Sequence, residues 1–139
     1  MAIRKQEFYE GAALHILARR GSISGIRYEP PWFVLNGRIL IHLKYSTRVR
    51  SPWSFTFTPN EQRLLYGASS RSKVVIGLIC GGDGVAAVPY DDFLSVASPR
   101  GSAVHVACYR SHAEHYEISG PDGGLSRKVA PSNWARLLD

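Results

Sequence analysis

The chain has 139 residues, a length that fits one domain with its own buried core. Its hydrophobic content of 45% and charged content of 20% are those of globular proteins and exclude wholesale disorder. Seventeen Lys and Arg residues oppose eleven Asp and Glu residues, and the net charge of +6 favours association with polyanions, nucleic acid first.

The first predicted element is a helix over residues 4–20. Side chains suited to one buried face recur there at helical spacing. They are Phe8, Ala12, His15 and Ile16. Arg19 and Arg20, at the C-terminal end of the segment, suit the negative end of the helix dipole.

The clearest hairpin is predicted over residues 32–45. Two strand-like runs flank Asn36-Gly37, which tolerates the positive φ angles of a tight hairpin turn. On the second run, alternation places Ile39, Ile41, Leu43 and Tyr45 on one face and Arg38, Leu40, His42 and Lys44 on the other. Residues 26–28 could start an earlier strand, but Pro30-Pro31 is expected to interrupt its pairing.

The remaining segments complete an α+β pattern. Residues 53–57 alternate aromatic and hydroxyl side chains, which predicts a strand with one aromatic face. The apolar run over residues 73–80 is typical of a central strand covered on both faces. Further helices are predicted over residues 59–65, 91–97 and 133–138, and further strands over 85–89, 102–110 and 116–119. This order indicates a mixed β-sheet flanked by helices.

Residues 4–89 resemble the αβββαβ core of the PD-(D/E)XK nucleases, the restriction-endonuclease-like superfamily. The resemblance depends on the element order and on the strand that ends in Lys44-Tyr45-Ser46-Thr47. We therefore expect a single domain over residues 1–139, with a restriction-endonuclease-like core over about 4–89 and a β-rich C-terminal extension over about 90–139.

In that superfamily, carboxylates and a lysine converge on a divalent metal that activates water and stabilises phosphoryl oxygens. By position, Lys44 is the motif lysine, and Glu10 is the helix carboxylate with Glu7 as a rival. Glu29 is the nearest strand-start acid, and His42 occupies the slot that an acid normally fills. The resemblance thus implies a catalytic set of Lys44, Glu10, His42 and Glu29, with Glu10 and His42 as metal ligands. Mg²⁺ would serve an active enzyme, but His42 supplies no negative charge, so weak or lost catalysis is expected.

A basic segment follows the lysine strand. Guanidinium groups and hydroxyls bind phosphate oxygens, and an indole can stack on a base or ribose. The expected nucleic-acid contacts are Arg48, Arg50, Trp53, Ser46 and Thr47. In the alternative interpretation, Trp53 belongs to the core and the two arginines are ordinary solvated loop residues.

Cys80 and Cys108 both lie in apolar strand-like runs, so they are expected to be buried, unpaired thiols. Cys108 also begins a C-x₃-H-x₂-H pattern with His112 and His115, but a structural zinc site needs four ligands, and a solvated loop explains the histidines better. No run approaches the roughly 18 apolar residues of a membrane span, so a cytoplasmic protein without a membrane partner is expected.

Three functions remain open. The first is a small nuclease-like domain that binds nucleic acid with weak or lost catalysis. The second is a divergent metal-dependent phosphodiesterase that needs a partner subunit to supply an acid. The third is a protein-interaction module or inhibitor that docks through the aromatic strand over residues 53–57.

Overall fold

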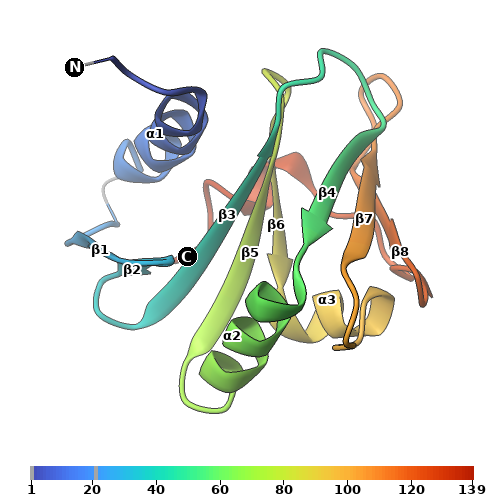
Figure 1. Ribbon diagram of the computed structural model, residues 1–139. Helices are drawn as coiled ribbons and strands as arrows, with labels where there is room; N and C mark the ends of the chain where they lie inside the picture. Colours follow the sequence, from blue (N-terminus) through green and yellow to red (C-terminus); the bar gives the residue numbers. More distant parts are fainter. Residues whose placement is uncertain (1, 21) are drawn as a thin grey trace.

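The computed structural model describes residues 2–20 and 22–139, which form an α+β fold, as expected (Figure 1). The helices are α1 (Lys5–Ala18), α2 (Pro59–Ser69) and α3 (Tyr90–Val96), and a short 3₁₀ helix, η1 (Pro131–Asn133), lies near the C-terminal end. The strands are β1 (Ile26–Glu29), β2 (Trp32–Leu35), β3 (Ile39–Ser46), β4 (Trp53–Phe57), β5 (Lys73–Cys80), β6 (Gly84–Pro89), β7 (Val104–Tyr109), β8 (Glu117–Gly120) and β9 (Gly123–Gly124).

The strands form two sheets. The larger sheet has five strands in the order β1-β2-β3-β5-β6, and the smaller sheet has four in the order β4-β7-β8-β9. Within the larger sheet only β3 and β5 run parallel, with Ile39 opposite Lys73 and Ser46 opposite Cys80. The smaller sheet is antiparallel throughout. Strands β3 and β5 therefore lie side by side in one mixed sheet.

The predicted Asn-Gly turn is confirmed. Asn36 and Gly37 have φ angles of 51° and 66°, and the Arg38 N–H donates to the Leu35 carbonyl at 2.9 Å. Positive φ angles at both central positions match the right-handed twist of the flanking strands, so the turn joins β2 to β3 without splaying them.

The expected effect of Pro30-Pro31 is wrong. The two prolines do not interrupt the pairing of β1, because they form the turn between β1 and β2. The β1–β2 ladder begins beside them, with Glu29 opposite Trp32. A proline in a turn needs no ladder hydrogen bond, so its missing N–H costs nothing there.

Helix α1 packs on the larger sheet through a different face from the predicted one. Its buried residues are Ala13 and Leu17, with Tyr9 partly buried on the same face, whereas Phe8 is 62% exposed. Several faces of this helix carry apolar side chains, so helical spacing alone did not select the face that meets the sheet. The helix itself, and its packing on the sheet, are as predicted.

Strand β4 is where the expected core departs most from the structure. The resemblance placed this aromatic strand among the three strands of the αβββαβ core, but β4 pairs with β7 in the smaller sheet. Its aromatic side chains, Trp53, Phe55 and Phe57, are at most 2% exposed. The expected core and C-terminal extension thus contribute to the same hydrophobic cluster, and the aromatic face of β4 is not available for docking on another protein.

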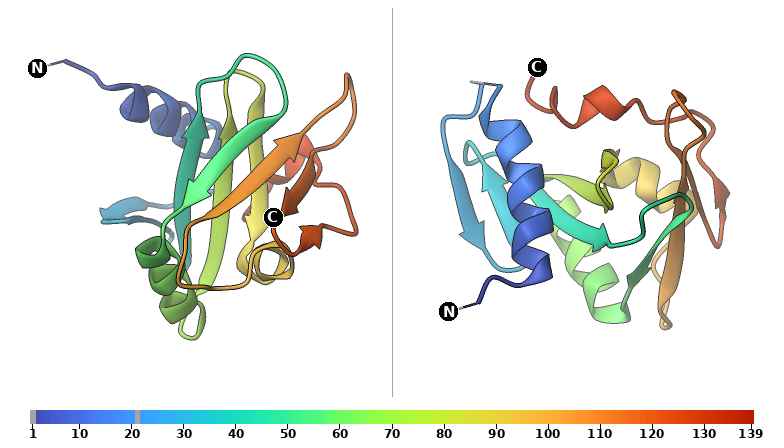
Figure 2. Two further views of the ribbon diagram at one scale, coloured as in Figure 1. Left: turned by 45° about the vertical axis from the view of Figure 1, so that its right-hand side comes forward. Right: turned by 90° about the horizontal axis from the view of Figure 1, so that it is seen from above.

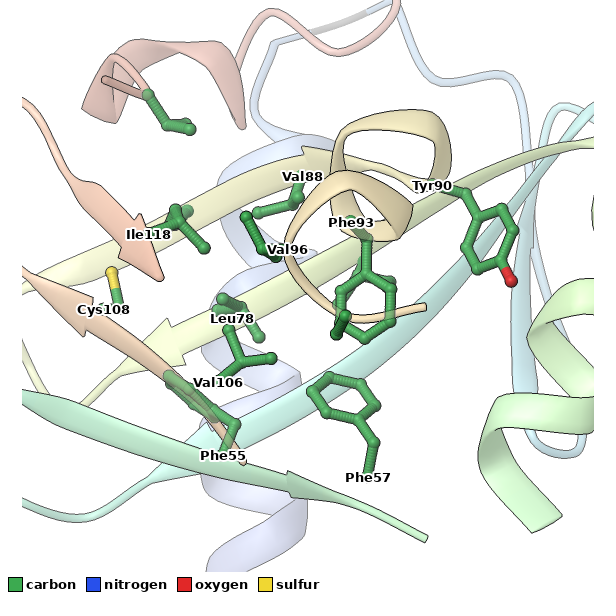
Figure 3. Packing of buried hydrophobic residues seen from close by; sticks show 14 of the residues in the cluster. Phe55, Phe57, Leu78, Val88, Tyr90, Phe93, Val96, Val106, Cys108 and Ile118 are labelled. Carbon is green, nitrogen blue, oxygen red and sulfur yellow. The ribbon is translucent and has the colours of Figure 1, made fainter. Parts of the chain in front are cut away.

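Two hydrophobic clusters occupy the two faces of the larger sheet. On one face, Ile41 and Leu43 pack against α1 and against Trp134, whose indole N–H donates to the Ala13 carbonyl at 2.9 Å. The other face packs against α2, α3 and the smaller sheet. Figure 2 shows α1 and the smaller sheet on opposite faces of the larger sheet. Figure 3 shows the second cluster, where Phe57 and Phe93 face each other with ring centroids 4.7 Å apart.

The helical turn predicted over residues 133–138 is misplaced, because the short helix η1 ends at Asn133 and residues 134–138 form turns. Among the described residues, no helix is long and apolar enough to cross a membrane.

Candidate functional site

Lys44 and His42 meet a carboxylate that the sequence analysis did not assign. Both side chains project from β3 toward α2 and bind the same oxygen of Glu61. The distance from Glu61 Oε2 to Lys44 Nζ is 2.8 Å, and that to His42 Nε2 is 2.9 Å. We call these three residues the Lys44 cluster.

The position of Glu61 follows from the start of α2. Thr58 is the N-cap residue, and its hydroxyl accepts from the Glu61 N–H at 3.1 Å. Glu61 Oε1 in turn accepts from the Thr58 N–H at 3.0 Å. This reciprocal capping box satisfies two backbone donors and leaves Oε2 turned toward β3. The Thr58-x-x-Glu61 spacing is a sequence signature of a helix start, and it was the one signal that could have singled out Glu61.

The Lys44 cluster is enclosed rather than open to solvent. The side chains of His42, Glu61 and Lys44 are 10%, 20% and 22% exposed. Lys44 Nζ also lies 5.1 Å from the centre of the Phe57 ring. Burial opposes the ionised carboxylate, but the hydrogen bonds from His42, Lys44 and the Thr58 backbone outweigh it and lower the pKa of Glu61 to about 2. The carboxylate therefore serves as a fixed counter-charge.

His42 has one ring nitrogen in the Lys44 cluster and one outside it. Nε2 faces Glu61, whereas Nδ1 is buried and has no hydrogen-bond partner in the described part of the chain. The Trp32 and Phe57 rings lie beside the imidazole, at centroid distances of 5.8 Å and 6.4 Å. Aromatic side chains thus surround the part of the ring that Glu61 does not contact.

The two acids expected beside Lys44 lie elsewhere. Glu10 belongs to α1, which covers the opposite face of the larger sheet, and its carboxylate accepts from the Gln6 side chain at 3.0 Å. Glu29 lies on the edge strand β1 and pairs with Arg27 at 2.6 Å. Of the four expected catalytic residues, the fold therefore brings together only His42 and Lys44.

The expected metal ligands do not converge either. Glu10 and His42 are separated by the larger sheet, because α1 and α2 pack on opposite faces of it. Cys108 is fully buried, while His112 and His115 are exposed in the following loop, so the C-x₃-H-x₂-H residues point to different environments. Across residues 2–20 and 22–139, no group of three or more His, Cys, Asp or Glu side chains is placed to hold a metal ion.

The second candidate feature is the loop over residues 47–52, which joins β3 to β4 and which we call the basic loop. It lies at the top of Figure 1, at the carboxyl end of β3. Arg48 and Arg50 are exposed there. Neither guanidinium lies within ion-pairing distance of a carboxylate in the described part of the chain. Thr47 is exposed and Ser46 half-buried beside them, so the predicted phosphate-binding groups gather at one strand end.

The basic loop is held in place by polar contacts. The Trp53 indole N–H donates to the Arg48 carbonyl at 2.9 Å, and the Ser51 hydroxyl donates to the Arg110 carbonyl at 3.1 Å. Trp53 is 2% exposed, so the expectation that it stacks on a base is wrong, and its role is to anchor the loop. Its position in the alternation of β4, with the aromatic face inward, explains the burial.

A close backbone approach fixes the other side of the basic loop. The Gly81 N–H donates to the Ser46 carbonyl at 2.9 Å. Gly81 has a φ of +55°, and a Cβ atom there would lie 2.2 Å from the Arg48 carbonyl oxygen. A glycine is therefore required for the β5–β6 turn to pass so close to the basic loop.

A partly exposed ion pair lies beside the basic loop, between Asp83 and Arg110. Asp83 accepts from the Tyr116 hydroxyl at 2.6 Å and from Arg110 at 2.9 Å. Burial and the hydrogen bond to Asp83 raise the pKa of Tyr116 well above its usual value. These contacts tie the β5–β6 turn of the larger sheet to the segment that joins β7 to β8, and they neutralise Arg110. Arg48 and Arg50, by contrast, have no carboxylate partner among the described residues.

No protein family, curated protein or solved structure matches this chain.

Proposed function

We propose that this protein is a small nuclease-like domain that binds nucleic acid through the basic loop, with weak or lost catalysis. The observation that carries the proposal is the state of Arg48 and Arg50. Both are exposed on an anchored loop, and neither has a carboxylate partner among the described residues.

Anchoring makes these arginines better phosphate ligands. A loop that is already ordered loses less conformational entropy when it binds, and this raises affinity for a given set of contacts. Arginine presents a planar fork of donors that matches phosphate oxygens, and the Thr47 hydroxyl adds a further donor nearby. The loop also follows the carboxyl end of β3, next to its parallel partner β5, and strand ends of this kind commonly bind ligands in open α/β sheets.

A restriction-endonuclease-like core is part of the proposal. Support comes from the order α1, the β1–β2–β3 meander, α2 and β5, into which β4 is inserted. Lys44 on β3 then corresponds to the motif lysine, and Glu61 supplies the neighbouring carboxylate from α2 rather than from the strand.

The hydrogen bonds that already occupy both oxygens of Glu61 support weak or lost catalysis. One of its oxygens caps α2, and the other is shared by Lys44 and His42. A carboxylate committed in this way has little capacity left to coordinate Mg²⁺, which sheds its water reluctantly. The alternative, a phosphodiesterase whose missing acids come from a partner subunit, would require Glu61 to give up its contacts with Lys44 and His42 before it could coordinate a metal ion.

The test is binding to labelled duplex DNA, single-stranded DNA and RNA, measured by fluorescence anisotropy across a salt series. Contacts with about four to six phosphates predict a log–log slope of roughly −4 to −5 on duplex DNA. The Arg48→Ala/Arg50→Ala variant should flatten that slope by about two units. A slope near zero for the wild type, or no binding at low salt, would refute the proposal.

A charge-matched control distinguishes binding by the basic loop from binding that depends only on the net positive charge of the protein. Arg63 and Arg71 are exposed, and they lie on and just after α2, which Figure 1 places at the end of the larger sheet opposite the basic loop. The Arg63→Ala/Arg71→Ala variant removes the same charge and should leave most of the slope intact. If both double variants flatten the slope equally, the basic loop is not the binding site.

A further inference from the structure

The two cysteines of this chain are in contact across the interface between the sheets. Cys80 is the last residue of β5 in the larger sheet, and Cys108 lies on β7 in the smaller one. Their sulfur atoms are 3.6 Å apart, and both residues are fully buried (Figure 3 shows Cys108 in this interface). They are 28 residues apart in the chain, so only the packing of one sheet on the other brings them together.

This geometry is close to that of a disulfide. A disulfide has a sulfur–sulfur distance of about 2.05 Å, so the two atoms must approach by about 1.5 Å. Rotation about the Cα–Cβ bonds and small shifts of two strand ends supply movements of that size. We propose that Cys80 and Cys108 form a redox modification site, at which a low-molecular-weight disulfide such as glutathione disulfide oxidises them to an intrachain disulfide that joins the sheets. This inference does not depend on the proposed function.

The reaction proceeds by two thiol–disulfide exchanges. The thiolate of one cysteine attacks a sulfur of glutathione disulfide, which forms a mixed disulfide and releases one glutathione thiolate. The second cysteine loses its proton and attacks the protein sulfur of the mixed disulfide, and the second glutathione leaves. The protein loses two electrons and two protons, and glutathione disulfide is reduced to two thiols.

Access of glutathione disulfide to the buried thiols controls the rate of oxidation. The hydrogen bond to Cys108 and burial raise the pKa of the Cys80 thiol far above its usual value, so the folded protein holds almost no thiolate there. Oxidation therefore takes place during local opening of the interface or during folding. A buried pair of this kind stays reduced in a reducing compartment and responds only to sustained oxidation.

The bond would form directly beneath the basic loop. Cys80 precedes Gly81, which binds the Ser46 carbonyl, and Cys108 lies opposite Trp53, which binds the Arg48 carbonyl. A cross-link between the two cysteines therefore joins the strands that hold both sides of the loop. Because it closes a loop of 28 residues, it should raise the Tm by roughly 10 °C.

The test is to refold the reduced wild type from urea in a glutathione buffer with excess disulfide and to read the products by non-reducing mass spectrometry. Refolding removes the barrier to access. The expected product is a monomer that has lost two hydrogens, has no titratable thiol, and melts about 10 °C above the reduced protein.

Control variants and contrary outcomes complete the test. Cys108→Ala and Cys80→Ala cannot form the intrachain bond, so they should carry at most one bound glutathione and show no rise in Tm on oxidation. The proposal is overturned if the refolded wild type keeps both thiols, carries two bound glutathiones, or forms disulfide-linked dimers instead. An intrachain bond that lowers the Tm would equally overturn it, because the sulfurs would then be held at a distance the fold does not tolerate.

Discussion

Replacing Glu61 with glutamine should cost much of the stability of this domain at neutral pH. The carboxylate is the counter-charge of Lys44 and accepts a hydrogen bond from His42 in an enclosed site, and the pKa of Glu61 falls there from 4.5 to about 2. Because one pKa unit corresponds to about 1.36 kcal/mol, the ionised carboxylate contributes about 3 kcal/mol to the free energy of unfolding. The same interaction is seen from the side of Lys44, whose ammonium loses its counter-charge; this typically costs about 3–5 kcal/mol in fully buried pairs and less in this partly exposed one.

The loss should depend on pH in a defined direction. The folded-state pKa of Glu61 is below the unfolded value, so the stabilisation is complete above about pH 5 and decreases as the pH falls toward 2. The wild type and Glu61→Gln should therefore differ by about 3 kcal/mol at pH 7 and converge as the pH approaches 2. Urea unfolding curves at a series of pH values measure this difference directly.

Glu7 provides a matched control. It holds the same N3 position in the capping box of α1, where its carboxylate accepts from the Arg4 N–H, but it is exposed and faces no buried cation. Glu7→Gln should therefore change stability by less than about 0.5 kcal/mol. Equal losses in the Glu7 and Glu61 variants, or a Glu61→Gln loss that does not vary with pH, would refute the ion-pair account and assign the effect to helix capping.

Three further predictions concern the hydrogen bond between Tyr116 and Asp83 and the catalytic chemistry. Tyr116→Phe removes the hydroxyl that donates to the Asp83 carboxylate at 2.6 Å, and it should cost about 1.5–3 kcal/mol in urea unfolding; a neutral result would show that solvent replaces this bond. The wild type should cleave DNA and RNA little or not at all with Mg²⁺ in a gel assay, since a phosphodiesterase needs carboxylates to concentrate metal charge at the scissile phosphate. Robust cleavage that Lys44→Ala abolishes would contradict this expectation. His42→Glu adds a carboxylate beside Glu61, so it should raise Mg²⁺ affinity measurably by calorimetry, and an unchanged affinity would argue against a nuclease-like site there.

The local sequence was sufficient to predict those features of the fold that depend on interactions between neighbouring residues. Asn36-Gly37 determines its turn, because few other residue pairs accept two successive positive φ angles. The alternation along β3 placed Leu43 on one face and Lys44 on the other, although the sequence did not show which elements pack on either face. The apolar run of β5 identified a central strand, since only a strand covered on both faces needs one.

Tertiary structure decided which of these faces meet. The pairing of Lys44 with Glu61 joins residues 17 positions apart on different elements, and the Thr58-x-x-Glu61 capping signature marks a helix start without indicating that its carboxylate meets Lys44. The packing of one sheet on the other also decides three further features. They are the pairing of β4 with β7 in the smaller sheet, the burial of Trp53 and the contact between the two cysteines. Backbone propensity acts over a few residues, so the sequence pattern indicates the helices and strands. Contacts between distant elements form where the whole chain buries its apolar surface best, so only the folded chain determines which elements pack together.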